Sequence, residues 1–206
     1  MDIEILKPFG PSIVKTKIPK EMIDEMNKYV EEVIEDSNKQ EKLDYGHKLA
    51  GNVKQEFLLE SDFMKKIKWA DFLALNVKEW LKTETDKKLK HFHIKSSWIV
   101  RQFKDEYNPV HYHGGHISGV GYLKVPSYLG EKRQEKKKVN NNGKLVLIHG
   151  SKNLLCNATY PVTPVVGDFY LFPNYLLHAV WPFTGTDEER RSISFNATLD
   201  EEASTY

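Results

Sequence analysis

Apolar residues recur with a helical period in the first third of the chain. They are spaced by four, three and four positions, at Met22, Met26, Tyr29 and Val33. This spacing puts them on one face of an amphipathic helix that begins after Pro19, and a polar stretch over residues 35–45 ends the predicted helix. A short strand-like lead precedes the helix, at Ile3, Ile5, Ile13 and Val14.

A second and clearer helical stripe covers residues 63–81. Ser61 or Asp62 can cap this helix, because both side chains accept hydrogen bonds from backbone amides at a helix start. The apolar positions of the stripe are Phe63, Ile67, Ala70, Leu73, Val77, Trp80 and Leu81. Residues 1–90 are therefore predicted to be mostly helical, and they carry no obvious chemical motif.

The pattern changes to strands at about Lys90. The segments that follow are short, rich in β-branched and aromatic residues, and separated by glycine, proline and asparagine: HISGVGYLKV, GKLVLIHG, GDFYLFP, HAVWPF and RRSISFNATL. Helices followed by strands, without alternation of the two, favour an α+β fold. We expect an antiparallel sandwich or jelly roll over residues 91–200, with the N-terminal helices packed on one sheet.

Composition favours a single globular domain over residues 1–206. Of the 206 residues 40% are hydrophobic, and the formal net charge is +1, so nothing global indicates nucleic acid or anionic lipid as a partner. The single cysteine, Cys156, cannot form an internal disulfide, and the N-terminus lacks the apolar run of a secretion signal. We expect a cytoplasmic protein without a transmembrane segment.

The segment GEKRQEKKKVNNNGK, residues 130–144, is too polar to belong to the core. It is predicted to be a long hairpin loop between two strands. Such a loop either keeps a sheet edge solvated or serves as a flexible lid or a contact for an acidic substrate. The residues alone leave both roles open.

Candidate metal ligands occur in the segment NPVHYHGGHISGVGYL. His111 and His113 are two positions apart on an expected strand, and this spacing puts both imidazoles on one face. His178, in FPNYLLHAVWPF, follows another strand and can meet them in a closed two-sheet fold. Three imidazoles indicate a transition-metal site without identifying the metal, and His116 is the reserve ligand. Ligand protonation is expected to weaken metal binding below about pH 6.5.

Arginine and serine alternate in the last predicted strand. Arg190 and Ser192 share one face, where a guanidinium and a hydroxyl can together bind a carboxylate. Arg191 lies on the other face, and its charged end is expected to reach solvent beside Ile193 and Phe195. Taken alone, this pattern is more typical of an ordinary half-exposed strand.

Four blocks in sequence order resemble a known family: HxH at residues 111–113, SGVGYLKVP, PVVGDFYLFPNYLLHAVWPF and ERRSISFN. Together they are similar to the 2-oxoglutarate/Fe(II)-dependent oxygenases common in marine bacteria and their phages, which are distantly similar to prolyl hydroxylases. The resemblance covers residues 96–199, with a weaker similarity in LAGNVKQEF. It implies a double-stranded β-helix, the cupin-like form of the jelly roll.

The resemblance also implies roles for individual residues. Three take the places of the Fe(II) ligands: His111, His113 and His178. His113 stands where most of the wider superfamily has a carboxylate, so the net charge at iron is higher by one. Arg190 and Ser192 are implied to bind the C5 carboxylate of 2-oxoglutarate, with Tyr122 as a further hydrogen-bond donor to it.

The implied activity is oxidative decarboxylation of 2-oxoglutarate to succinate and CO2, with O2 consumed and a bound substrate hydroxylated. Two other classes stay open. One is a cupin-like three-histidine metalloenzyme that does not use 2-oxoglutarate, and the other is a non-catalytic jelly-roll binding module with an inert metal. A peptidyl side chain, a nucleotide and a small metabolite are all compatible with these residues as substrates.

Overall fold

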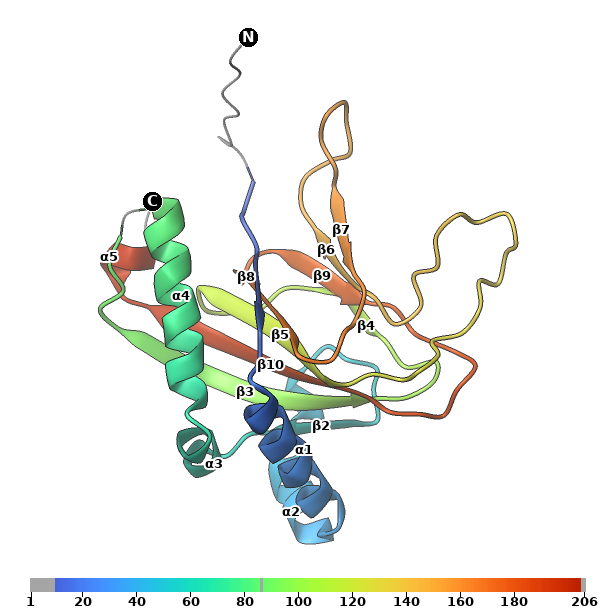
Figure 1. Ribbon diagram of the computed structural model, residues 1–206, viewed down its shortest axis with the longest axis horizontal. Coiled ribbons are helices and arrows are strands. Elements are labelled where there is room, and N and C mark those ends of the chain that lie inside the picture. The colour runs from blue at the N-terminus through green and yellow to red at the C-terminus, as the bar shows by residue number, and fades with distance from the viewer. Residues whose placement is uncertain (1–9, 86, 205–206) are drawn as a thin grey trace.

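Two antiparallel sheets pack against each other in the structure, a computed structural model that describes residues 10–85 and 87–204 (Figure 1). The larger sheet has six strands in the order β1-β8-β5-β10-β3-β2. These strands are β1 (Val14–Lys17), β8 (Asp168–Pro173), β5 (Ile117–Lys124), β10 (Arg190–Leu199), β3 (Phe92–Gln102) and β2 (Gln55–Leu58). Ile3 and Ile5 lie outside the described residues.

The smaller sheet has four strands in the order β4-β9-β6-β7. They are β4 (Asn108–His111), β9 (Leu177–Val180), β6 (Leu145–Ile148) and β7 (Thr159–Val162). The pairings within both sheets are antiparallel. This architecture confirms the predicted α+β jelly roll.

Helices cover the outer face of the larger sheet. The helical elements are α1 (Lys20–Ile34), α2 (Ser37–Leu43), the 3-10 turn η1 (Gly46–Lys48), α3 (Ser61–Lys66), α4 (Trp69–Thr85) and α5 (Glu201–Ser204). In Figure 1, α1 and α4 lie across this sheet. Their apolar stripes and the sheet form one core, which includes Met26, Trp69, Leu73, Ile99, Phe169 and Phe195.

Strand alternation gives the larger sheet two chemically different faces. On β10, Phe195 packs into the helix-covered core, whereas Arg190 and Ser192 take the alternate positions and point toward the smaller sheet. Ser192 pairs with Tyr122 of β5, and Tyr122 packs in a second core with Leu147 of the smaller sheet. The space between the sheets is therefore lined by polar groups as well as by apolar side chains.

The helical prediction needs two corrections. The stripe expected to be one helix from residue 61 to 81 is two helices, because Lys68 adopts a left-handed conformation with φ of 55° between α3 and α4. The polar stretch after α1 contains a further helix, α2. Its N-cap Asp36 accepts hydrogen bonds from the backbone amides of Asn38 and Lys39.

Two strands of the N-terminal third belong to the larger sheet. β1 pairs with β8, and β2 pairs with β3, so the first 90 residues supply both edges of this sheet besides the helices. Each of these strands has four residues, which is too short for alternation to stand out in the sequence. The assignment of residues 1–206 to one domain stays a prediction.

The polar segment 130–144 is a loop without a helix or strand of its own, as predicted, and extends away from the sheets (Figure 1). The expectation of a hairpin was wrong, because the strands on either side of it, β5 and β6, belong to different sheets. Across residues 10–85 and 87–204, the helices are all too short or too polar to cross a bilayer.

Candidate metal centre

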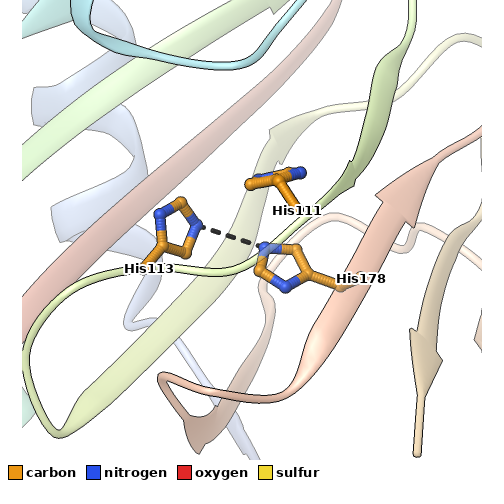
Figure 2. Close-up of side chains that lie close together, drawn as sticks. All are labelled: His111, His113 and His178. Carbon is orange, nitrogen blue, oxygen red and sulfur yellow. Dashed lines mark hydrogen bonds between the residues drawn. The ribbon is translucent and has the colours of Figure 1, made fainter.

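Three histidine side chains meet between the two sheets. His111 ends β4, His178 lies opposite it in β9, and His113 follows two residues after the end of β4. One ligand nitrogen from each lies within 4.8 Å of the others. The Nε2 atoms of His113 and His178 are 3.1 Å apart, and Figure 2 shows the rings gathered around one point.

Backbone carbonyls orient two of the imidazoles. His111 Nδ1 lies 2.7 Å from the carbonyl oxygen of Pro109, and His178 Nδ1 lies 2.9 Å from that of Leu176. A neutral imidazole that donates its Nδ1 proton to a carbonyl leaves Nε2 unprotonated. This is the arrangement that metal-binding histidines use, because it fixes both the tautomer and the ring orientation.

His113 reaches the centre from a loop and not from a strand. The expectation that His111 and His113 share a strand face was wrong, because β4 ends at His111. Asn174 holds the loop instead: its carbonyl oxygen accepts the His113 amide at 3.1 Å, and its Nδ2 donates to the His113 carbonyl at 2.8 Å. The His113 ring contacts the Trp98 indole at a centroid distance of 5.6 Å.

All three imidazoles are neutral near neutral pH. Burial and the neighbouring His178 and His111 lower the pKa of His113 to about 3. Burial, with His111 next to it, lowers the pKa of His178 to about 4, and burial also lowers the pKa of His111. Neutral nitrogen is the form that coordinates a metal, so the donors are ready for an ion.

The spacing of the nitrogens also fits an ion. Two ligands at right angles, each about 2.1 Å from a metal, are about 3.0 Å apart, and the His113–His178 separation is 3.1 Å. The reserve ligand His116 lies outside this group, since its Nδ1 accepts a hydrogen bond from the Leu199 amide at 3.0 Å.

A second polar site lies on the face of the larger sheet that points toward the smaller sheet. Arg190 is 1% exposed, and its Nη1 donates to Gln102 Oε1 at 2.8 Å. Its Nε and Nη2 have no hydrogen-bond partner among the described residues, and neither does the buried Tyr122 hydroxyl. The guanidinium lies over the Tyr122 ring at 5.0 Å, and burial lowers the pKa of Arg190.

Arg190 and Ser192 share a strand face, as predicted. Ser192 is buried and directly opposite Tyr122, so the guanidinium and both hydroxyls belong to one surface. Ser194 of β10 pairs with Trp98, which contacts His113. Arg190 is four residues from Ser194, about 13 Å along the strand. The long Arg190 side chain shortens this gap from one end, and an ion held by the histidines would shorten it from the other. A short diacid can span what is left.

Arg191 differs from the prediction. It is 1% exposed, and its guanidinium donates to both carboxylate oxygens of Glu189, at 2.7 and 2.8 Å. It also pairs with Glu31 of α1 at 2.8 Å and bonds to Asn27. The expectation that its charged end reaches solvent was wrong, because α1 and Glu189 cover that side of the strand.

Sequence reasoning missed Gln102 and Trp98. Gln102 is fully buried, and its Nε2 donates to the Glu106 carbonyl at 2.6 Å while its Oε1 accepts from Arg190. Strand alternation places Trp98 and Gln102 on the same face of β3. Only the cross-strand pairing, however, assigns Gln102 to Arg190.

The jelly roll and the imidazoles that meet between its sheets define a metal-binding jelly-roll protein. Residues 96–196 match a family model described as "Putative 2OG-Fe(II) oxygenase". Over this segment, which contains all three histidines and Arg190, the chain belongs to the 2OG-Fe(II) oxygenase family and is an enzyme of that family. No curated protein sequence matches the chain.

Solved structures with a similar fold include a prolyl hydroxylase and an α-ketoglutarate-dependent epimerase. A prolyl-4-hydroxylase from Pseudomonas putida has a TM-score of 0.54 and 14% identity over 91% of both chains. The α-ketoglutarate-dependent epimerase SnoN of nogalamycin biosynthesis has a TM-score of 0.60 and 14% identity, over 91% of this chain and 78% of its own. HygX from Streptomyces hygroscopicus, with nickel and 2-oxoglutarate bound, has a TM-score of 0.57 and 11% identity, over 91% of this chain and 82% of its own. At these identities the likeness is one of fold.

Proposed function

We propose that this protein is an Fe(II)/2-oxoglutarate-dependent dioxygenase that hydroxylates a bound substrate and converts 2-oxoglutarate to succinate and CO2. In this proposal the Fe(II) ligands are His111, His113 and His178. Arg190, Ser192 and Tyr122 bind the C5 carboxylate of 2-oxoglutarate. When bound, the iron supplies the redox chemistry with O2, and the protein supplies position and exclusion of water.

The observation that carries the proposal is the buried Arg190 cation with unsatisfied donors, which points into the same space between the sheets as the three imidazoles. A buried donor without a partner costs about 1–3 kcal/mol, and a charged one costs more. Arg190 has two such groups, Nε and Nη2, and the Tyr122 hydroxyl is a third. A carboxylate placed between them satisfies all three and neutralises the charge.

Gln102 supports the assignment, because it is neutral. Its amide holds one end of the Arg190 guanidinium, at 2.8 Å from Nη1, without cancelling the positive charge. Within the described residues no carboxylate forms an ion pair with Arg190, whereas the adjacent Arg191 pairs with Glu189 and Glu31. The site thus keeps a net positive charge for an anionic ligand.

Two measurements test the proposal: metal content, and 2-oxoglutarate binding with succinate formation by the Fe(II)-loaded protein under controlled oxygen. The wild type should bind one metal ion per chain and form succinate slowly without added substrate. His178→Ala should lose the metal, since two imidazoles alone hold it weakly. Tyr122→Phe should keep the metal and bind 2-oxoglutarate at least about tenfold more weakly, because a hydrogen bond to a charged group contributes about 1.5–3 kcal/mol.

Tyr160→Phe is the matched control, since Tyr160 is 53% exposed on β7. It should behave as the wild type. A metal-loaded wild type that neither binds 2-oxoglutarate nor forms succinate would instead favour the cupin-like three-histidine class. Full metal content in His178→Ala would rule out the triad.

A further inference from the structure

Glu56 is a buried carboxylate that neither the metal centre nor the oxoacid site uses. It lies on β2 opposite Val100, on the face of the larger sheet that points toward the smaller sheet. It is 1% exposed, and neither Oε1 nor Oε2 accepts a hydrogen bond from any described residue. A lone buried carboxylate is strongly disfavoured in its charged form, so a cationic ligand that pairs with it would stabilise it.

The carboxylate lies beneath a glycine-containing turn and beside β4. A Cβ placed on Gly51 would be 3.0 Å from Glu56 Oε1 and 3.1 Å from Asn108 Nδ2, and one placed on Gly46 would be 3.6 Å from Oε2. Asn108 begins β4, the strand that ends at His111. Glu56 therefore lies between the edge strand of the larger sheet and the strand that leads to the candidate metal centre.

Two further carboxylates make this region negative. Burial is the largest cause that raises the pKa of Glu56 to about 7, and the negative charges of Asp44 and Glu106 add to it. Both neighbours already bind backbone amides: Asp44 accepts from Gly46, and Glu106 accepts from Lys54 and Phe103. Of these three acidic groups, Glu56 alone has both oxygens free.

Aromatic rings connect this carboxylate region to the metal centre. The Trp98 ring contacts His113 at a centroid distance of 5.6 Å and Tyr45 at 6.1 Å. The register of β2 on β3 pairs Glu56 with Val100 and Leu58 with Trp98, so Trp98 is a diagonal neighbour of Glu56 on the same face, and the Tyr45 amide donates to the Glu56 carbonyl at 2.8 Å. A carboxylate beside aromatic faces is the combination that binds organic cations, through ion pairing and cation–π contact.

We propose that Glu56, with the Tyr45–Trp98 ring pair, binds a cationic nitrogen group of the substrate, so that the substrate is an ammonium- or guanidinium-bearing molecule. This inference rests on the proposed oxygenase function, because it places the rest of that molecule toward His113. The ligand reaches Glu56 by displacing the covering turn, in which His47, Lys48 and Ala50 are exposed.

The test uses butylguanidinium and butylammonium as probes, with butyrate and 1-butanol as anionic and neutral counterparts. Each is titrated into the full 15N-labelled chain, metal-free and again with diamagnetic Zn(II) and 2-oxoglutarate, and followed by NMR at the Gly46 and Gly51 amides and the Trp98 indole. The cations should saturate at about 1–10 mM and shift these three signals. The counterparts should leave them unmoved.

Three variants assign the effect to the carboxylate. Glu56→Gln keeps the shape and removes the charge, so cation affinity should fall at least about tenfold. Glu56→Asp keeps the charge on a shorter side chain and should retain part of the affinity, while its spectrum reports on folding. Glu25→Gln, a control on α1 whose carboxylate pairs with Lys66 at 2.7 Å, should bind as the wild type.

The inference is wrong if no cation binds to the wild type, if 1-butanol binds as well as the cations, or if Glu56→Gln binds them undiminished. Affinity for 2-oxoglutarate and succinate formation without substrate are measured in parallel in the wild type and in Glu25→Gln, where both should be equal. If cations bind but the wild type neither binds 2-oxoglutarate nor forms succinate, the oxygenase proposal is rejected and the cation site remains supported.

Discussion

Two adjacent arginines in β10 have opposite electrostatic surroundings. Arg191 is buried against Glu189 and Glu31, so its charge is compensated within the protein. Arg190 is equally buried, but its partner is the neutral Gln102. At the scale of single residues, the neutral amide at position 102 leaves the charge of Arg190 uncompensated, whereas Glu189 and Glu31 compensate the charge of Arg191.

Gln102→Glu tests this distinction. A carboxylate at this position would pair with Arg190 and repel an incoming dianion, so 2-oxoglutarate affinity should fall by at least about tenfold while metal content stays constant. Gln102→Leu removes the hydrogen bond but keeps the positive charge available. Gln102→Leu should therefore lose less affinity for 2-oxoglutarate than Gln102→Glu when binding is measured anaerobically. The reverse order would show that the placement of the Arg190 guanidinium matters more than its net charge.

Arg191→Ala should reduce stability and leave the oxoacid site intact. Glu189 would keep Arg101 as a partner, at 2.9 Å, but would lose the ion pair and hydrogen bonds to Arg191, so the free energy of unfolding should fall by about 1–3 kcal/mol in urea titrations. The affinity for 2-oxoglutarate should change by less than about threefold. Arg133→Ala is the control, because Arg133 is exposed and 3.9 Å from Asp105, and it should cost less than about 1 kcal/mol. An Arg191→Ala protein with the free energy of unfolding of the wild type would contradict the structural role of Arg191.

At the scale of elements, β5 depends on two glycines that face the helix layer. A Cβ on Gly121 would be 2.5 Å from Phe169, and one on Gly119 would be 2.6 Å from Phe195 and 2.8 Å from the Tyr170 carbonyl oxygen. Both phenylalanines are fully buried. The absence of side chains on this face of β5 is therefore what lets the large rings of β8 and β10 pack beneath the helices.

Gly119→Ala should destabilise the protein by about 1–3 kcal/mol, because the added methyl group overpacks the core and one of its contacts is unyielding backbone. Gly114→Ala is the matched control. Its nearest neighbour would be Lys95 Nζ at 3.5 Å, an ordinary contact with a flexible side chain. Urea unfolding of the metal-free proteins measures both, and equal effects would mean that β5 can shift to accommodate the methyl group.

At the scale of the whole molecule, burial of the histidine cluster couples folding to pH. Unfolded histidine titrates near about pH 6.5, whereas the pKa of folded His113 is about 3 and that of His178 about 4. Between these values the unfolded chain binds more protons, so stability rises with pH and is lost as pH falls below about 6.5. Glu56, with its pKa raised to about 7, acts in the opposite sense, because its stability contribution falls as pH rises from about 4.5 to 7.

The prediction is a loss of up to about 2 kcal/mol per buried histidine between pH 6.5 and pH 5 in the metal-free protein. It is best measured by urea unfolding in the Glu56→Gln background, which removes the opposing group. His178→Gln should reduce the slope, and His93→Gln, at an exposed position, should not. Metal binding to the folded protein should persist well below the pH 6.5 midpoint expected of free imidazoles, and a midpoint at that value would show that the cluster is solvated.

The jelly roll, the two helical stripes and most residues of the two candidate sites could be predicted from the sequence, whereas α2, Gln102 and Trp98 could not. Periodicity records which face of a helix or a long strand is buried, and the HxH, LFP…H and RxS blocks are local enough to be read directly. The α1 stripe and the alternation of Arg190 and Ser192 are examples, and both correspond to the structure.

What only the tertiary structure decided depends on contacts between residues far apart in the sequence. The pairing of Arg190 with Gln102, the Glu189 and Glu31 partners of Arg191, and the unpartnered Glu56 follow from strand register and helix packing. The left-handed turn at Lys68 and the loop placement of His113 also follow from packing. None of these has a local signature, because the electrostatic free energy of a buried charge is set by the groups that surround it in space.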